Sequence, residues 1–286
     1  MSEFRATELR ACVIGHPIAH SRSPLIHKYW LAVHKIKGDY TRLDVLPDEI
    51  ERFFDEFPER GFVGCNVTIP HKEVAFRKVV EADPVARVLG AVNTIWVKDG
   101  RLYGASTDVH GFIANLNRSQ PGWEAKTKTA VMIGAGGASR AIAYGLLEKK
   151  IQNIVVANRT FERAKELAAH FGNRLVPVAL SNVAPHLREA DLLVNATSLG
   201  MSGQPPLDLD LSPLKKSAIV YDVVYAPLET ELLKAAKARG NPVVDGLGML
   251  LHQAAPAFER WFGVRPEVTP ELRALVASDL AREAKR

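Results

Sequence analysis

Short apolar runs alternate with longer amphipathic segments in the first third of the chain. The apolar runs predict strands over 11–15, 40–45 and 62–69, and the amphipathic segments predict helices over 24–34 and 48–57. Strand and helix alternating in this way indicate an α/β fold with a mostly parallel sheet. Two more apolar runs flank Asp99-Gly100, a strong hairpin signal, so we expect this sheet to end in an antiparallel edge.

A second alternating series starts near residue 128. It predicts strands near residues 130, 154, 175, 193 and 220, with helices between them and a last short strand over 242–245. A polar segment with Pro and Gly, 118–128, separates the two series, and we interpret it as a connector. Two helical stretches, 249–261 and 270–284, follow the second series, and its sheet requires neither of them. The 286 residues are therefore expected to form two α/β domains.

A glycine-rich turn follows directly on the strand predicted near residue 130 and consists of Gly134, Ala135, Gly136, Gly137 and Ala138. Helical spacing continues after it, so the context is strand, tight turn and helix. Glycine lets the backbone approach a pyrophosphate, and the N–H groups and dipole of the helix start meet its charge. Alone, such a turn suits an ordinary strand-to-helix connection equally well. The flanking strand and helix favour a dinucleotide site of the Rossmann type.

The end of the next predicted strand indicates which dinucleotide binds. An NAD-preferring site carries Asp or Glu there, to accept a hydrogen bond from the 2′-hydroxyl of the adenosine ribose. This chain has Asn158, Arg159 and Thr160 instead, and Arg163 follows one helical turn later. An acid would repel a 2′-phosphate, whereas a guanidinium matches its charge and its acceptor oxygens. We therefore expect NADP as the cofactor.

Composition and charge exclude several other classes of protein. With 47% hydrophobic and 24% charged residues, the chain is neither disordered nor fibrous in type. Its net charge of +5 suggests an anionic ligand, but basic and acidic residues are interleaved, so we expect a small molecule and no nucleic acid. Residues 1–10 lack an apolar signal core, and no apolar run is long enough to span a membrane.

Cysteine and histidine usage completes this picture. Cys12 and Cys65 have neither a metal-ligand spacing nor a disulfide pattern, so buried free thiols are expected. His16, His20 and His27 suggest a metal site, but no accompanying ligand spacing supports one, and we expect no metal. The chain is thus expected to be a cytoplasmic protein without membrane contact, either a monomer or a homodimer.

Polar residues gather at predicted strand ends in the first domain. Ser21 and Ser23 precede a helix; Ser23 is a suitable N-cap, whereas capping leaves Ser21 unexplained. Asn66 and Thr68 share one face of a strand, and Lys72 follows just past its end. Side chains at the carboxyl ends of strands line the crevice in which open α/β sheets bind ligands. These residues are therefore candidates for substrate contact, although Lys72 alone also suits a solvated helix start.

Two further polar residues have simpler explanations when taken singly. Asn93 at the beginning of a strand suits a turn, and Asp108 at a strand-to-helix junction suits an N-cap. Together with the serines, amides and lysine above, they supply the groups that a small polyol or hydroxy acid needs. Because the dinucleotide domain starts only near residue 128, we expect the first hundred residues to form the substrate domain.

Several segments have a distinctive sequence: 14–18 with 21–24, 66–72, 90–94, 107–108, 195–201, 222–227 and 248–254. They cover nearly the whole chain, and in this order they resemble the shikimate dehydrogenase family, which includes quinate dehydrogenases. The resemblance implies a substrate domain over 1–110, to which 250–286 return, facing an NADP-binding Rossmann domain over 111–249 across a cleft. It also implies the reversible, NADPH-dependent reduction of 3-dehydroshikimate to shikimate in aromatic amino-acid (chorismate) biosynthesis.

The resemblance further implies roles for particular residues. Lys72 and Asp108 match the family's catalytic pair, and the carboxylate of shikimate would meet Ser21 and Ser23. The ring hydroxyls would meet a larger set, namely Asn66, Thr68, Lys72, Asn93, Asp108 and Gln253, with Tyr225 nearby. Met201 and Gly246 match positions near the nicotinamide, and Thr197 and Val223 complete the expected cofactor contacts.

Two alternatives to this function remain open. One is a quinate/shikimate dehydrogenase of broader specificity, because quinate differs from shikimate chiefly by an extra ring hydroxyl and by ring saturation. The other is a catalytically idle, NADP-sensing relative with the same fold, since fold alone does not decide function. The presence of both Lys72 and Asp108 disfavours the idle relative.

Overall fold

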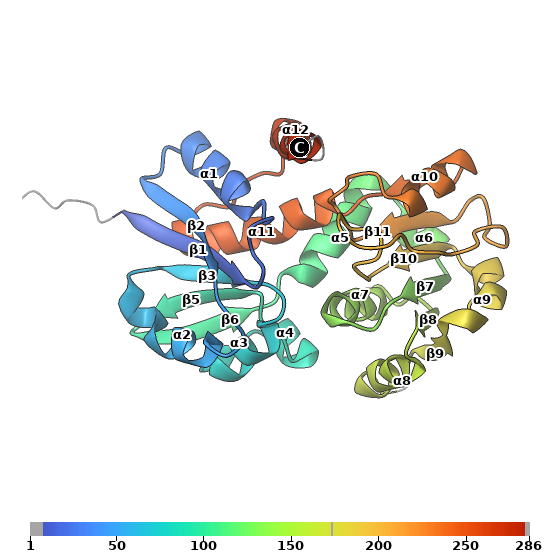
Figure 1. Ribbon diagram of the computed structural model, residues 1–286, viewed down its shortest axis with the longest axis horizontal. Coiled ribbons are helices and arrows are strands. Elements are labelled where there is room, and N and C mark those ends of the chain that lie inside the picture. Colours follow the sequence, from blue (N-terminus) through green and yellow to red (C-terminus); the bar gives the residue numbers. More distant parts are fainter. Residues whose placement is uncertain (1–7, 173, 284–286) are drawn as a thin grey trace, which may run out of the picture. The chain divides into compact units, whose positions relative to one another are not determined.

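The computed structural model describes residues 8–172 and 174–283 (Figure 1). These residues divide into two compact units. The first contains the described residues up to Thr107 together with Gln253–Leu272, and the second contains Asp108–His252 and the described residues from Arg273. Of the segment 250–286, which is expected to return to the substrate domain, Gln253–Leu272 belong to the first unit, and Arg273 in the second unit forms an ion pair with Asp245. The expected absence of a signal sequence falls largely on residues 1–7, outside the described residues.

The first unit is built on a six-stranded sheet (Figure 1). Its strands are β1 (Leu9–Gly15), β2 (Gly38–Asp44), β3 (Gly64–Val67), β4 (Glu81–Ala82), β5 (Thr94–Lys98) and β6 (Arg101–Ala105), in the order β2-β1-β3-β5-β6-β4. β1 pairs in parallel with β2 and β3, whereas β3, β5 and β6 pair antiparallel. Asp99 and Gly100 have φ of 51° and 68° in the β5–β6 turn, so the predicted hairpin is confirmed.

Short helices connect these strands. They are α1 (Ser23–Val33), α2 (Ile50–Glu56), the 3₁₀ helix η1 (Phe57–Arg60), α3 (Lys72–Lys78) and α4 (Pro84–Leu89). The sequence did not predict β4, because two residues are too few for a period to show. It did not predict α4 either, although two local signals mark that helix. Asp83 Oδ1 accepts a hydrogen bond from Ala86 N at 2.6 Å at its start, and Gly90 follows its end with φ of 63°.

The two cysteines lie in the core of the first unit. Cys12 on β1 and Cys65 on β3 are partners in the parallel register, and both are fully buried. Both thiols are free, as the sequence predicted. Burial raises the pKa of Cys65, so its unreactive thiol form is favoured.

The second unit has a six-stranded sheet in which all neighbouring strands are parallel (Figure 1). Its strands are β7 (Thr129–Ile133), β8 (Asn153–Asn158), β9 (Val176–Ala179), β10 (Leu192–Asn195), β11 (Ile219–Asp222) and β12 (Val243–Val244), in the order β12-β11-β10-β7-β8-β9. This is the doubly wound order of a Rossmann fold, in which the connections change direction between β7 and β10. Ligands bind beyond the carboxyl ends of the strands at such a point.

The remaining helices are α5 (Asp108–Ser119), α6 (Trp123–Lys126), α7 (Gly137–Glu148), α8 (Phe161–His170), the 3₁₀ helix η2 (Leu180–Asn182), α9 (Ala184–Glu189), α10 (Glu231–Ala238), α11 (Leu247–Phe262) and α12 (Pro270–Glu283). The expected connector 118–128 contains α6 and is therefore more ordered than its composition suggested. Trp123 is the reason, because its ring is buried and its Nε1 donates to Asn117 Oδ1 at 2.8 Å.

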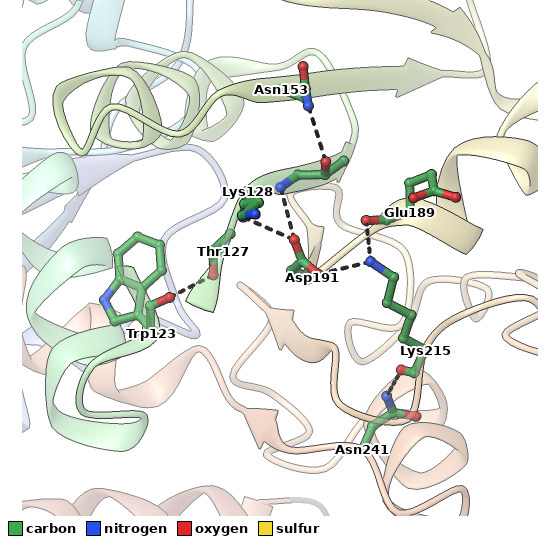
Figure 2. Close-up of polar contacts among 9 residues, drawn as sticks. Trp123, Thr127, Lys128, Asn153, Glu189, Asp191, Lys215 and Asn241 are labelled. Atoms are coloured by element: carbon green, nitrogen blue, oxygen red, sulfur yellow. Dashed lines mark hydrogen bonds and ion pairs between the residues drawn. The ribbon is translucent and has the colours of Figure 1, made fainter. Parts of the chain in front are cut away.

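At the amino ends of β7 and β10, the carboxylate of Asp191 ties the two strands together (Figure 2). Its Oδ2 accepts hydrogen bonds from Lys128 N and Thr129 N at 2.9 and 3.1 Å, and its Oδ1 accepts one from Lys215 Nζ at 3.0 Å. Burial acts to raise the pKa of Asp191, but these hydrogen bonds outweigh it and hold the pKa below its usual value. This edge lies opposite the one expected to bind the cofactor.

An aromatic cluster joins α11 to the sheet of the first unit. The ring of His27 stacks on Tyr40, with centroids 4.0 Å apart, and Trp30, Phe258 and Trp261 pack around it. His27 is fully buried, and this burial lowers its pKa to about 3. The imidazole is therefore neutral in the folded protein throughout the physiological pH range.

The neutral state of His27 predicts a dependence of stability on pH. The pKa of His27 is about 3 in the folded protein and near 6.5 in the unfolded chain. The contribution of neutral His27 to the free energy of unfolding is therefore fully present above pH 6.5 and is lost as the pH falls toward 3. Between neutral pH and pH 5, wild type should lose about 2 kcal/mol more unfolding free energy than His27→Phe, which keeps an aromatic ring. Urea unfolding at both pH values measures this difference. An identical loss in both proteins would contradict the prediction, and His170→Gln, at an exposed histidine, should behave like wild type.

Candidate active site

Gly134 ends β7 in a conformation that only glycine adopts easily. Its φ is +112°, and a Cβ at this position would lie 2.8 Å from Thr197 Cγ2. Its N–H donates to Ala157 O at 2.8 Å, which continues the pairing of β7 with β8 past the end of the strand. The first glycine of the turn is therefore required by backbone conformation and by close packing against the loop that follows β10.

The rest of the turn leaves space on its outer side. A Cβ at Gly136 or Gly137 would meet no atom within 4 Å. Helix α7 begins at Gly137, so the N–H groups of Gly137 and Ala138 lie in its first turn and have no partner within the helix. Gly136 N donates to Ser139 Oγ at 3.1 Å, which holds the turn in place, and Ala135 lies between the two ends. An anionic pyrophosphate fits this arrangement of open space and N–H donors.

The residues that follow β8 lie where an adenosine ribose would be expected. Asn158 Nδ2 donates to Thr160 O at 2.8 Å and so shapes the turn into α8. Thr160 occupies the N-cap of α8, and Arg163 N donates to Thr160 O at 3.1 Å. Arg159, Thr160 and Arg163 are all exposed. The two guanidinium groups therefore belong to one turn of chain and are accessible to a phosphate.

Thr197 and Val223 follow the ends of the neighbouring strands β10 and β11. Thr197 donates its hydroxyl to Asn195 Oδ1 at 2.7 Å. A Cβ on Gly246 would lie 2.1 Å from Val223 O, so only glycine lets these two segments approach so closely. Met201 is 40% exposed, so its side chain is accessible to a ligand. These expected cofactor residues all belong to the second unit.

In the first unit, Ser21 and Ser23 lie at the start of α1. Ser23 is the first helical residue and Arg22 occupies the N-cap, so the sequence-based placement of Ser23 as the cap is wrong by one residue. The side chain that contacts the start of α1 is Ser21, whose Oγ accepts a hydrogen bond from Ser23 N at 3.3 Å. This contact explains the serine that capping by Ser23 left unexplained.

Asn66 is held by a residue that the sequence analysis did not single out. Tyr40 OH donates to Asn66 Oδ1 at 2.7 Å, and both side chains are buried. Burial raises the pKa of Tyr40 far above its usual value, so it remains a neutral donor. The amide of Asn66 donates in turn to Asn93 O at 3.2 Å and Thr94 Oγ1 at 3.3 Å. Tyr40 belongs to β2, whose other residues are half-buried or exposed, so the sequence of this strand does not mark its hydroxyl as a buried donor.

Thr68 and Lys72 follow the end of β3. Thr68 is half-buried, and its N–H donates to Ile14 O at 2.9 Å, which extends the pairing with β1. Lys72 is also half-buried and begins α3. The preceding residue, His71, is buried and donates from Nε2 to Val45 O at 2.7 Å. The start of α3, and with it the position of Lys72, is thereby fixed against the core.

Asn93 connects three segments of the first unit. Its Oδ1 accepts a hydrogen bond from Thr107 N at 2.9 Å, and its Nδ2 donates to Thr107 Oγ1 at 3.0 Å and to Gln253 Oε1 at 3.3 Å. The structure thus brings together the expected substrate contacts Asn66, Asn93 and Gln253, from β3, the start of β5 and α11. Asn93 also fixes Thr107, the residue directly before Asp108.

The other expected substrate contacts belong to the second unit. Asp108 is the first residue of α5 and is 9% exposed, and Tyr225 is half-buried in the segment after β11. Within residues 8–172 and 174–283, no group of three or more His, Cys, Asp or Glu side chains is placed to hold a metal ion. In the same ranges, no helix is both long and apolar enough to cross a bilayer.

The doubly wound sheet and its glycine turn define a dinucleotide-binding protein with a second α/β unit. Family models match along the chain: the shikimate dehydrogenase substrate binding domain over 13–95, shikimate / quinate 5-dehydrogenase over 116–201, and the shikimate 5′-dehydrogenase C-terminal domain over 246–275. The chain therefore belongs to the shikimate dehydrogenase family. The predicted fold class, an N-terminal α/β domain plus a Rossmann domain, is confirmed.

Individual relatives agree with this assignment. A shikimate dehydrogenase (NADP(+)) of Azorhizobium caulinodans is 59% identical over 276 residues, which are 96% of this chain and 98% of the relative. The structure of shikimate 5-dehydrogenase from Thermus thermophilus with NADP(H) and shikimate is 37% identical, with a TM-score of 0.84 and coverage of 96% and 99%. Quinate dehydrogenase from Corynebacterium glutamicum with NAD is 34% identical, with a TM-score of 0.87 and coverage of 95% and 99%.

The open space at Gly136 predicts that a larger side chain there weakens cofactor binding with little loss of stability. Gly136→Val should fold with a loss of about 1 kcal/mol, because a Cβ there meets no protein atom within 4 Å and the main cost is the lost preference for glycine at the N-cap. NADPH affinity should fall by about tenfold or more, since the side chain would occupy the space of the pyrophosphate. Fluorescence titration with NADPH measures the affinity, and thermal unfolding measures the stability. An unchanged affinity would show that the turn binds no pyrophosphate.

Proposed function

We propose that this protein is an NADP-dependent shikimate dehydrogenase, an oxidoreductase that reversibly reduces 3-dehydroshikimate to shikimate in chorismate and aromatic amino-acid biosynthesis. The observation that carries this proposal is the cluster of Asn66, Asn93 and Gln253 in a unit without a dinucleotide turn, in a chain whose other unit has one. The similarity to enzymes named shikimate dehydrogenase (NADP(+)), at 59% identity, supports it.

In this proposal the second unit holds NADP. The turn from Gly134 to Ala138 binds the pyrophosphate, and Arg159 and Arg163 bind the 2′-phosphate, with Asn158 and Thr160 shaping that turn. Thr197, Met201, Val223 and Gly246 line the nicotinamide end. The bound cofactor supplies the hydride chemistry.

The first unit supplies most of the substrate contacts. Ser21 and Ser23 bind the carboxylate of shikimate, each with a hydroxyl donor. The ring hydroxyls are bound by a larger set of residues, namely Asn66, Thr68, Lys72, Asn93, Asp108 and Gln253, with Tyr225 nearby. Amides suit this task, because each offers both a donor and an acceptor to a hydroxyl group.

Lys72 and Asp108 act as the catalytic pair. As hydride reaches the ketone carbon, negative charge develops on the ketone oxygen and must be stabilised and protonated. The Lys72 ammonium stabilises that charge and donates a proton, and the Asp108 carboxylate orients the ammonium and keeps it charged. General acid–base assistance of this kind contributes roughly 10²- to 10⁴-fold in rate.

We also propose that the protein works in the cytoplasm as a monomer or a homodimer, on a small-molecule substrate, without nucleic acid or membrane partners. The two free, buried thiols of Cys12 and Cys65 suit a reducing compartment. The interleaved charges of the sequence suit a freely diffusing enzyme.

Quinate oxidation, with NAD as cofactor, is the second candidate. The likeness to a quinate dehydrogenase in complex with NAD, with a TM-score of 0.87, favours it. Assays of wild type with shikimate and quinate, each with NADP and NAD, distinguish the two candidates. We expect the highest kcat/KM for shikimate with NADP. Arg159 lies where an NAD-preferring site carries Asp or Glu. By resemblance to the family, a Thr or Gly in place of Ser21 or Ser23 accompanies quinate use, and this chain has serine at both positions. Equal or better use of quinate would overturn the choice of substrate.

The basic end of β8 predicts how cofactor choice depends on one side chain. Arg159→Ala should raise KM for NADP about tenfold or more, because a charged hydrogen bond to the 2′-phosphate contributes about 1.5 to 3 kcal/mol. Its use of NAD, which lacks that phosphate, should hardly change. Arg188→Ala removes a charge from another exposed position and should affect neither cofactor. Equal weakening of both cofactors by Arg159→Ala would instead identify Arg159 as structural.

The roles of Lys72 and Asp108 predict a pattern in the kinetics. Lys72→Ala and Asp108→Asn should each lower kcat by about 10²-fold or more with a smaller change in KM for shikimate, because the stabilised charge exists only in the transition state. The double variant should be little worse than the poorer single one, since the two residues act as a unit.

Melting temperatures show whether these variants fold, and Lys78→Ala is a matched control. Lys78 lies at the other end of α3 and pairs with Asp55 and Glu51, so its loss should leave kcat unchanged. Retained turnover in Lys72→Ala would favour the solvated helix-start interpretation of Lys72. A wild type that binds NADPH but oxidises no shikimate would instead identify the idle, NADP-sensing relative.

A further inference from the structure

We propose that Asp222 is a positioning residue for the cofactor site: its carboxylate holds the two loops that carry Thr197, Met201 and Val223. Asp222 is not among the cofactor or substrate contacts expected from the sequence. The inference rests on the proposed function in one respect, namely that these loops line the nicotinamide.

Asp222 lies at the end of β11 and is fully buried. Its Oδ1 accepts hydrogen bonds from Asn195 Nδ2 and Val224 N, both at 3.0 Å, and its Oδ2 accepts one from Thr230 Oγ1 at 2.7 Å. Burial raises the pKa of this carboxyl group, and the three hydrogen bonds oppose that rise. A buried carboxylate is costly unless such donors surround it, so its presence here requires an explanation.

The neighbouring contacts fix the direction of every hydrogen bond to Asp222. Asn195 Oδ1 already accepts from Thr197 N at 3.1 Å and from Thr197 Oγ1 at 2.7 Å, so its amide nitrogen is the group that donates to Asp222. Thr230 Oγ1 accepts from Leu233 N at 3.3 Å, which leaves its single proton for Asp222. The backbone N–H of Val224 can only donate. Asp222 therefore faces donors at both oxygens, and only a group that accepts at both fits.

This network spans the ends of two neighbouring strands. The Thr197 hydroxyl accepts from Leu199 N at 3.1 Å, and Asn195 Nδ2 also donates to Leu199 O at 3.1 Å, so the loop toward Met201 is held through Asn195. Val223 N donates to Asn195 O at 3.0 Å, which joins the second loop to the first. Together with this backbone bond, the Asp222 carboxylate joins Asn195 at the start of the first loop to Val224 in the second.

The same sheet contains a natural control in Asp191 (Figure 2). Asp191 also accepts three hydrogen bonds and also joins neighbouring segments, but at the amino ends of β7 and β10. None of its partners is an expected cofactor or substrate contact. Removing its charge therefore tests what a structural carboxylate does in this sheet.

The test compares Asp222→Asn with Asp191→Asn. In Asp222→Asn the amide nitrogen must face a donor, because donors lie at both oxygens. We expect the affinity for NADPH, titrated without substrate, to fall about tenfold, as for the loss of a buried hydrogen bond. KM for shikimate should change much less, because the first unit supplies most of its contacts. Asp191→Asn should lower the melting temperature and leave NADPH affinity unchanged.

A second pair of variants keeps the test decisive if Asp222→Asn does not fold. Thr230→Ser keeps the hydroxyl that donates to Asp222 and should bind NADPH like wild type. Thr230→Val keeps the shape but removes the hydroxyl, and it should weaken NADPH binding. If both variants bind NADPH equally, or if Asp222→Asn only lowers the melting temperature as Asp191→Asn does, the network is structural and the proposal is wrong. Failure of wild type to oxidise shikimate while binding NADPH would overturn the proposed function alone.

Discussion

Parallel pairing of neighbouring strands is the constraint that decides, within each unit, where the candidate site residues lie. Because β7, β8, β10 and β11 run in one direction, the glycine turn and the loops after the other three strands all emerge at one edge of the sheet. The same holds for β1 and β3 in the first unit. Asn93 reaches that edge differently. It precedes β5, which runs antiparallel to β3 and so begins where β3 ends.

Asparagine recurs at these edges for a physical reason. Asn66, Asn93 and Asn195 each accept a hydrogen bond at the amide oxygen and donate through the amide nitrogen to a different segment. A carboxylate could only accept, and a hydroxyl has a single proton to give. An amide can therefore join a segment that offers a donor to one that offers an acceptor. The ends of the strands are thereby positioned by side chains that also suit the recognition of hydroxyl groups.

Much of the fold was predictable because its signals are local. The strands of the second unit are buried in parallel sheets and appear as short apolar runs, and the hairpin at Asp99 and the turn at Gly134 need glycine or left-handed residues. The order of α6 depends on one buried tryptophan, and the ion pair of Arg273 with Asp245 joins positions 28 residues apart. No periodicity reveals either contact.

The candidate site was predictable only in part, for a related reason. The sequence motifs identify the candidate residues at the strand ends, but not the buried side chains that position them by hydrogen bonds. Tyr40 reaches Asn66 across 26 positions, and Asp222 reaches Asn195 across 27. Such contacts form only when strands are placed side by side, so a local pattern contains no trace of them. Tyr40 and Asp222 both belong to strands, where a buried polar group is costly without partners.

The register of β1 and β3 has a practical consequence for following this protein as it unfolds. The chain has two cysteines, and both are fully buried as partners across these strands. A thiol reagent can reach them only when the β1–β3 pair opens, and the raised pKa of Cys65 suppresses slow attack in the closed state. The second unit contains no cysteine. The rate of thiol labelling therefore reports the opening of the first unit and is insensitive to opening of the second.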